Sequence, residues 1–281
     1  MKPQIFEPSS ELKEFVLCYW NLEGDNDTTP IKNTIVPDGT MKLIFHYADT
    51  YKHHPKNGES IVLPKCFLIG QLTQPYIVEP LGVTGSFVVR FHPSGFLPFT
   101  TIPIKEMENT AVPIATLFGE DGAEIGEKIL HAQDTFERIR LIEPFLLKRL
   151  TDKKTIDFVV KSTIETMFEA NGTLTVNECS QKLNINRRQL ARKFSSAIGL
   201  SPKQLAKTMR IQAALKTLLL KEVPSLTDLA YENEYFDQAH FIKDFKEFTG
   251  LTPKEFYGEE LKMSLIFDRE AHHRKAHHRE A

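Results

Sequence analysis

The chain has few cysteines and no long apolar run, and each shortage excludes a class of protein. Only three of its 281 residues are cysteine, and Cys18, Cys66 and Cys179 lie far apart. They form neither a disulfide framework nor the Cys-x-x-Cys pair of a zinc site. No apolar run reaches the length of a membrane span, and the N-terminal residues lack the apolar core of a signal peptide. We therefore expect a cytoplasmic protein with no membrane association.

Motifs of catalysis are also absent. The sequence has no nucleophile motif and no Gly-rich phosphate loop, and the segment GEDG (119–122) is interpreted as a turn. The candidates for a metal site of the cupin type, which needs clustered histidines and a carboxylate, are His46, His53, His54 and His92. They form no His-x-His pair, and we interpret them as scattered surface side chains. We expect no catalytic residue, no metal and no cofactor, so the protein is predicted not to be an enzyme.

Length and pattern indicate two domains and an α+β fold. In residues 1–132, short apolar runs alternate with Gly, Pro, Asn and Asp, which is typical of a β-rich sandwich or barrel-like domain. Strands are predicted at 16–22, 31–36, 41–47, 60–63, 67–69, 76–78 and 85–91. One short helix is expected over 9–16. A longer helix over 134–150 belongs to a connecting segment, 133–154.

The C-terminal part contains an internal repeat. GLSPKQL (199–205) returns as GLTPKEF (250–256), at an offset of 51 residues. A glycine can end a helix in the left-handed conformation, and Ser-Pro or Thr-Pro can begin the next one. Leu190 and Phe194 match Phe241 and Phe245 at the same offset. The repeat predicts two copies of one structural unit.

Each copy is preceded by a shorter helix, which gives helix-turn-helix spacing. The first unit is predicted as helix 176–183, a turn at 184–186 and helix 187–198. Asn184 tolerates a left-handed turn, and Asn186 can cap the helix that follows. The inward residues of the second unit are predicted to be Leu226, Leu229, Ala230, Tyr235, Phe241 and Phe245. A long helix, 202–220, is expected to join the units, with Leu205, Met209, Ala213 and Leu220 on one buried face.

Two such units on one helix resemble the DNA-binding domain of the AraC/XylS transcriptional regulators. The matching residues are LARKF…GLSP (190–202), RIQAA (210–214) and YFDQAHF (235–241), followed by GLTPKEF. The resemblance implies that residues 155–260 form an all-α domain that binds double-stranded DNA. It also implies a sequence-specific transcription regulator that reads two successive major-groove segments. One residue departs from the pattern, because Glu234 stands where the family usually has Gly, and we expect an altered turn there.

The N-terminal half carries a second resemblance. IVPDG (35–39), FLIGQ (67–71) and VRFHPSGF (89–96) look like the N-terminal domain of one AraC subgroup. This domain is the effector or dimerisation module in many members, so a regulatory or sensor-like role is implied. The sequence names no small-molecule effector, and it leaves a homodimer open. The alternative hypothesis is a cupin-type metal-dependent enzyme, or a ligand-binding protein, with a DNA-tethering C-terminal domain.

Charge divides the two units. Residues 162–221 contain ten Lys or Arg and three Asp or Glu, a local net charge of +7, whereas residues 222–260 have the reverse counts and a charge of −7. The first unit is therefore the candidate phosphate-binding surface. The acidic second unit is expected to bind DNA more weakly, or to contact a partner such as RNA polymerase.

The residues that read DNA are expected on the outer faces of the second helices, because the N-terminal residues of a recognition helix reach base edges. Arg188 and Arg192 lie one turn apart on one face, and Arg can pair bidentately with guanine. By the resemblance, Arg188, Ala191 and Arg192 face the bases, and Arg187 and Lys193 are placed for phosphates. The predicted DNA-binding set is Asn186, Arg187, Arg188, Ala191, Arg192, Lys193, Gln238, His240 and Lys243.

The last segment, 261–281, loses the helical pattern. It ends in REAHHRKAHHREA, a five-residue repeat. Paired histidines could bind a metal weakly, but we interpret the segment as a disordered, solvated tail.

Overall fold

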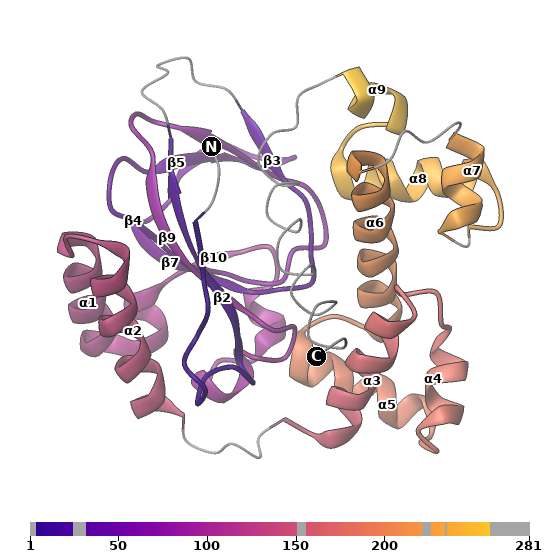
Figure 1. The fold of residues 1–281 in the computed structure, drawn as a ribbon, viewed down its shortest axis with the longest axis horizontal. Helices are drawn as coiled ribbons and strands as arrows, with labels where there is room; N and C mark the ends of the chain where they lie inside the picture. Colours follow the sequence, from indigo (N-terminus) through magenta and orange to yellow (C-terminus); the bar gives the residue numbers. More distant parts are fainter. Residues whose placement is uncertain (1–3, 25–31, 151–155, 221–225, 234, 259–281) are drawn as a thin grey trace, which may run out of the picture.

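The structure is a computed structural model, and it describes residues 4–24, 32–150, 156–220, 226–233 and 235–258. The predicted tail, segment 261–281 with its REAHH repeat, and Glu234 lie outside these ranges. The β-rich part lies between two helices, α1 and α2, on one side and the C-terminal helices α3–α9 on the other (Figure 1). Within the described residues, no helix is both long and apolar enough to span a membrane.

The N-terminal half contains two antiparallel sheets that do not close into a barrel. The six-stranded sheet has the order β1 (Gln4–Phe6), β2 (Val16–Glu23), β9 (Gly85–Phe91), β4 (Lys42–His46), β7 (Cys66–Ile69) and β10 (Ala111–Pro113). The four-stranded sheet has the order β3 (Asn33–Ile35), β8 (Tyr76–Pro80), β5 (Tyr51–His54) and β6 (Ile61–Val62). The prediction of a β-rich N-terminal half is confirmed.

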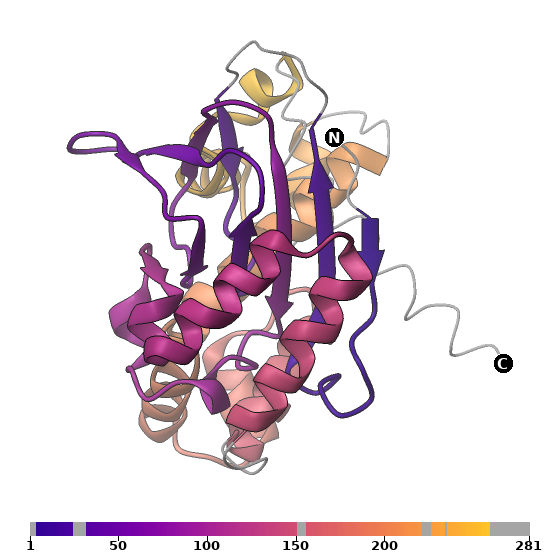
Figure 2. The same cartoon turned by 90° about the vertical axis from the view of Figure 1, so that its left-hand side faces the viewer.

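Side chains along the central strands alternate between the two faces of the sheet, and this divides the core into two layers. In β4, Leu43 and Phe45 join the main cluster under α1 (Ile114–His131) and α2 (Thr135–Arg149). Ile44, between them, packs against clusters on the other face of the sheet. This is the period of two that a strand imposes. Figure 2 shows α1 and α2 lying together across the sheet.

Two local predictions are wrong in this half. Residues 9–15 form turns instead of a helix, in which Leu12 N–H bonds to Ser9 O and Phe15 N–H to Leu12 O. The turns place Leu12 and Phe15 in the core just before β2 begins. The GEDG segment lies inside α1, although Gly119 has φ 63° and ψ −143° and interrupts the helical geometry there.

Helix α2 packs on the N-terminal core. Asp134 caps it by accepting from Glu137 N–H at 2.7 Å, and Ile142 and Leu146 are fully buried in the main cluster. Two short 3₁₀ helices, η1 (Leu97–Phe99) and η2 (Ile104–Met107), precede β10. The predicted boundaries at 132 and 154 stay predictions.

The C-terminal half is helical, as predicted. Its helices are α3 (Phe158–Glu169), α4 (Val176–Lys182), α5 (Arg187–Ile198), α6 (Pro202–Leu220), α7 (Leu226–Glu232), α8 (Gln238–Thr249) and α9 (Pro253–Gly258). The long helix α6 buries residues toward both units. Leu205 and Met209 pack with α3 and α5, whereas Ile211 and Leu215 pack with α7 and α8. The expected single face is therefore wrong, and Ala213 is only half-buried, because the two units lie on different sides of the helix.

The three N-terminal motifs meet at one turn, Val36–Thr40, which we call the joint turn. The Asp38 carboxylate lies 2.9 Å from both Lys42 Nζ and Arg90 Nη2. Burial alone would raise the pKa of Asp38, but the two cations outweigh it and lower the pKa to about 2. Gln71 Nε2 donates to Gly39 O at 3.1 Å. Residues from all three motifs therefore hold this turn in one conformation.

The joint turn contacts the C-terminal half. Gln212 Nε2 on α6 donates to Pro37 O at 2.7 Å. Val36 belongs to the buried cluster of α6, α7 and α8. Gly39, with φ +74°, lies so close to α6 that an added Cβ would be 2.6 Å from Leu205 Cδ1. The two halves thus share packing at this point.

Candidate nucleic-acid interface

The first helix-turn-helix unit is built by local signals that the sequence displays. Thr175 and Glu178 form a reciprocal capping box at the start of α4. Asn184 has φ 47° in the turn, and Asn186 Oδ1 accepts from Arg188 N–H at 2.8 Å. Gly199 ends α5 with φ 80°. The predicted turn and both helix ends are confirmed.

Packing decides which face of α5 points outward. Leu190 and Phe194 are completely buried in a cluster with α3 and α6. On the other side, Arg187, Arg188 and Arg192 are exposed, and Ala191 between them is half-buried. The structure therefore presents three guanidinium groups along one exposed surface of this helix.

Lys193 is less free than its neighbours. Its Nζ lies 2.5 Å from Asp157 Oδ2, at the start of α3. The hydrogen bond from Lys193 lowers the pKa of Asp157. Because its charge is already paired with a carboxylate, Lys193 should attract a phosphate less strongly than the three arginines, which pair with no described carboxylate.

The second unit repeats the frame with different surface residues. Asp237 caps α8 by accepting from His240 N–H at 2.7 Å. Gln238, His240 and Lys243 are exposed, and Thr227 donates to the Gln238 amide oxygen at 3.3 Å. The predicted effect of Glu234 falls outside the described residues.

Acidic residues of the second unit neutralise part of the linker helix. Lys207 Nζ lies 2.8 Å from both Asp244 and Glu247 on α8. Asp244 is buried, and His240 Nε2 lies 3.6 Å from it. Among described residues, no carboxylate forms a salt bridge with Arg187, Arg188 or Arg192 of the first unit or with Lys203 or Arg210 of the linker helix.

Three side chains of this surface were missed by sequence reasoning. Phe236 is 89% exposed just before the cap of α8, although its type indicates a core residue. Lys203 and Arg210 stand seven residues apart on α6. That spacing puts them on one helix face, which is the signal that could have found them.

The histidines of the alternative hypothesis occupy separate environments. His46 is buried, with Nδ1 2.7 Å from Ser86 Oγ and its ring 4.9 Å from that of Tyr51. His53 is buried in β5, and its ring stacks on Tyr76 at 3.6 Å. The prediction of surface positions is wrong for both, because the alternation in β5 and β4 turns these rings toward packed aromatics.

The other two histidines are half-buried. His54 Nε2 lies 2.6 Å from Glu79 Oε2, and His92 Nε2 lies 3.2 Å from Lys13 O. In the part of the chain that the structure describes, no three His, Cys, Asp or Glu residues form a group that could hold a metal ion.

Two known families match separate parts of the chain. Residues 179–258 match a family described as a Helix-turn-helix domain, and residues 4–113 match a Domain of unknown function (DUF6597). An Uncharacterized HTH-type transcriptional regulator SAS0078 of Staphylococcus aureus is 30% identical over 86 residues, 31% of this chain and 11% of the relative. A regulator of the same description from Haemophilus influenzae is 28% identical over 116 residues, 41% of this chain and 37% of the relative.

Two solved structures are similar at lower identity. ToxT from Vibrio cholerae is 15% identical, with 91% of this chain and 98% of ToxT covered and a TM-score of 0.43. The C-terminal domain of AraT, a response regulator from Geobacillus stearothermophilus, is 23% identical, with 37% and 86% covered and a TM-score of 0.34. The chain spans about a tenth of the length of the Staphylococcus relative and about a third of the Haemophilus one.

The C-terminal half of the chain therefore contains two helix-turn-helix units joined by one linker helix, α6. The C-terminal part of this chain is an AraC-type helix-turn-helix domain, and the N-terminal part is a DUF6597 domain. The resemblance drawn from the repeat is confirmed.

Proposed function

We propose that the chain is a sequence-specific DNA-binding transcription regulator that reads two successive major-groove segments of double-stranded DNA. The observation that carries this proposal is the AraC-type domain with two recognition helices, α5 and α8, each packed by its inner face and exposed along its outer one. Helices of this kind enter the major groove. Binding, and not catalysis, is the proposed work of the protein.

The first unit supplies most of the affinity in this proposal. Arg188 and Arg192 read guanine, Ala191 lies against a base between them, and Arg187 contacts phosphate. The three guanidinium groups have no described carboxylate partner, so their charge is available to DNA. Lys193, tied to Asp157, contributes a phosphate contact only after that pair opens.

The second unit supplies sequence preference with less attraction. Gln238 is placed to pair with adenine, and Lys243 with guanine or phosphate. His240 also belongs to the exposed set, and Phe236 adds an apolar side chain that can contact a thymine methyl group. The −7 charge of residues 222–260 weakens its attraction to DNA, and the same acidity makes it a surface for RNA polymerase.

Two further proposals concern the whole protein. The three described cysteines are free, which fits the reducing cytoplasm. The DUF6597 domain is the regulatory half, and a homodimer through it would place two reading domains on one DNA.

Selection from random duplexes tests the function. Purified full-length protein is incubated with a random duplex library, the bound duplexes are sequenced, and the enriched motif is footprinted. We expect a motif with two parts, centred about one helical turn (~10 base pairs) apart. Failure to enrich any sequence above the starting library would overturn the proposal.

A further inference from the structure

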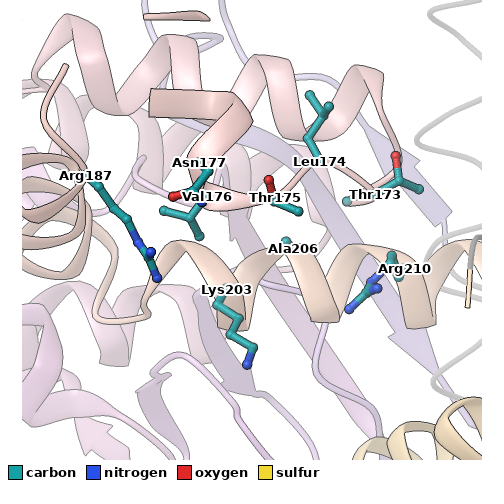
Figure 3. Close-up of a pocket in the computed structure, with 10 residues that line it drawn as sticks. Thr173, Leu174, Thr175, Val176, Asn177, Arg187, Lys203, Ala206 and Arg210 are labelled. Carbon is teal, nitrogen blue, oxygen red and sulfur yellow. The ribbon is translucent and has the colours of Figure 1, made fainter. Parts of the chain in front are cut away.

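A cavity lies between the first unit and the linker helix. Its volume is about 250 Å³, and it is lined by the connection from α3 to α4, the first turn of α4, the first residue of α5 and one face of α6 (Figure 3). Gly172, with φ +75°, lets the connection approach α6 so closely that an added Cβ would be 2.2 Å from Ala206 O. The close contact between this connection and α6 therefore forms part of the cavity wall.

Three cations line this cavity. They are Arg187 of α5 and Lys203 and Arg210 of α6, which are labelled in Figure 3. The neighbouring Glu178 carboxylate turns to Thr175, accepting from its N–H and hydroxyl at 2.7 Å each. No described carboxylate pairs with the three cations, so the positive charge along this cavity attracts an anion.

One of these cations is also unsatisfied on the protein side. The Arg210 guanidinium lies 5.0 Å from the centre of the Tyr235 ring, and its Nε is buried without a hydrogen-bond partner. Buried polar atoms are rarely left unpaired. The ring contact uses none of the guanidinium N–H groups as hydrogen-bond donors, so they can donate to a ligand of the cavity.

The cavity lies beside the first reading helix, and one of its lining residues contacts the second unit. Arg187 is the first residue of α5 and precedes the proposed reader Arg188. At the other end, Arg210 stacks on Tyr235, which lies two residues before Asp237, the cap of α8. A protein that reads two successive major-groove segments leaves a stretch of sugar-phosphate backbone between them.

We propose that this cavity binds a phosphate group of the DNA backbone between the two segments, held by Lys203, Arg210 and Arg187. The proposal rests on the proposed DNA-binding function and adds to it a phosphate contact from the linker helix. Such a contact fixes the position of the domain on the duplex and carries no sequence information.

The test is the salt dependence of binding to one random-sequence duplex, measured by fluorescence anisotropy with the full chain. We expect Lys203→Gln to reduce the slope of log K against log salt by about 0.9, the value for one phosphate contact. Lys203 is exposed, so its substitution leaves the fold intact. Thr173→Glu, which puts a carboxylate into the cavity lining, should weaken binding further at low salt. The matched control is Lys148→Gln, an exposed lysine on α2, and the β-rich part lies between α2 and α6 (Figure 1).

Each outcome decides a different claim. If the wild-type chain binds no duplex at any salt, the proposed function fails and this proposal with it. If the wild type binds DNA but Lys203→Gln and Lys148→Gln have the same slope of log K against log salt, the proposed function stands and the phosphate cavity is overturned. If inorganic phosphate raises the melting temperature of the wild type and not of Lys203→Gln, while both keep one slope, the cavity binds a free anion and not DNA.

Discussion

Arg188 and Arg192 stand on the exposed face of α5 with no described carboxylate beside them. We expect Arg188→Ala and Arg192→Ala each to weaken binding to the selected duplex by about 1–3 kcal/mol, the range for one bidentate base contact. Binding to a scrambled duplex of the same length should fall much less. The dissociation constants of both duplexes provide the measurement.

Lys193→Ala is the matched comparison on the same helix. It removes a charge without removing a base contact, so both duplexes should weaken alike and the salt slope should fall. If Lys193→Ala and the two arginine variants behave alike on both duplexes, the assignment of base-facing and phosphate-facing residues is wrong.

His46 makes the fold sensitive to acid. Burial lowers its pKa from 6.5 to about 4, because the charged ring would lose its water. The unfolded chain binds a proton as the pH falls through 6.5, whereas the folded chain does so only near pH 4. The free energy of unfolding should therefore fall across this window, by on the order of 3 kcal/mol from this residue.

Urea unfolding at a series of pH values checks the prediction. His46→Gln should flatten the loss between pH 6.5 and pH 4. His53, whose pKa burial also lowers, contributes with the same sign. Equal pH slopes for His46→Gln and the wild type would remove His46 as the cause. Asp38, with its pKa near 2, contributes stability that is lost only below about pH 4.

Local residue roles could be predicted, and paired charges could not. Asn184, Asn186 and Gly199 act within one turn of their own position, so the sequence displays their function. The pair of Lys193 with Asp157 joins residues 36 positions apart, and it depends on how α3 packs on α5. Nothing local indicates such a pair.

At the level of elements, the repeated glycines offer a comparison within one chain. Gly199 and Gly250 end α5 and α8 with nearly the same backbone, φ 80° and 82°. A Cβ on Gly199 would lie 3.0 Å from Ile104 Cγ2 of η2, whereas one on Gly250 would meet only Pro75, at 3.7 Å. Both alanine variants are strained by about 1 kcal/mol or more, and Gly199→Ala should be the more destabilising.

Thermal and urea unfolding of the two variants measure the difference. The common backbone cost cancels between them, so the remainder reports the contact between α5 and η2. Equal destabilisation would mean that Ile104 moves aside freely.

Elements with a strong period were predicted well, and elements without one were missed. Helices α3 to α8 follow the 3.6-residue repeat of their apolar positions. Strand β5 reads YKHH and buries Tyr51 and His53, so its inner face does not stand out as apolar. Strand β10 contains a proline at an edge of the sheet, and α1 contains three glycines. In each case tertiary packing overrides local preference.

At the scale of the molecule, Gln212 tests whether the halves stabilise each other. Its side chain donates to Pro37 O across the contact at 2.7 Å. We expect Gln212→Ala to lower the stability of the full chain by about 1 kcal/mol. In a fragment of residues 152–260, which lacks Pro37, the same substitution should have almost no effect.

The fragment also tests the proposed domain boundary. It should fold alone and bind DNA, because α6 buries residues of both units, but with a lower melting temperature than the domain has in the full chain. An equal effect of Gln212→Ala in fragment and full chain would show that the hydrogen bond to Pro37 contributes nothing. An insoluble fragment would show that the two halves depend on one shared core.

The contact between the halves was beyond the reach of the sequence. The motifs around Asp38, Gln71 and Arg90 could be seen as separate runs, but not as the parts of one turn. That turn packs on residues more than 160 positions away. Such a contact depends on the shapes of two finished surfaces, which no local pattern encodes.

The joint turn and η2 approach the reading domain through the end of α5 at Gly199 and through α6, while the outer face of α5 stays exposed. Positions 188, 191 and 192 are therefore separated from the contact between the halves. As the proposed readers, these positions can be exchanged among descendants of a common ancestor while the N-terminal half stays unchanged.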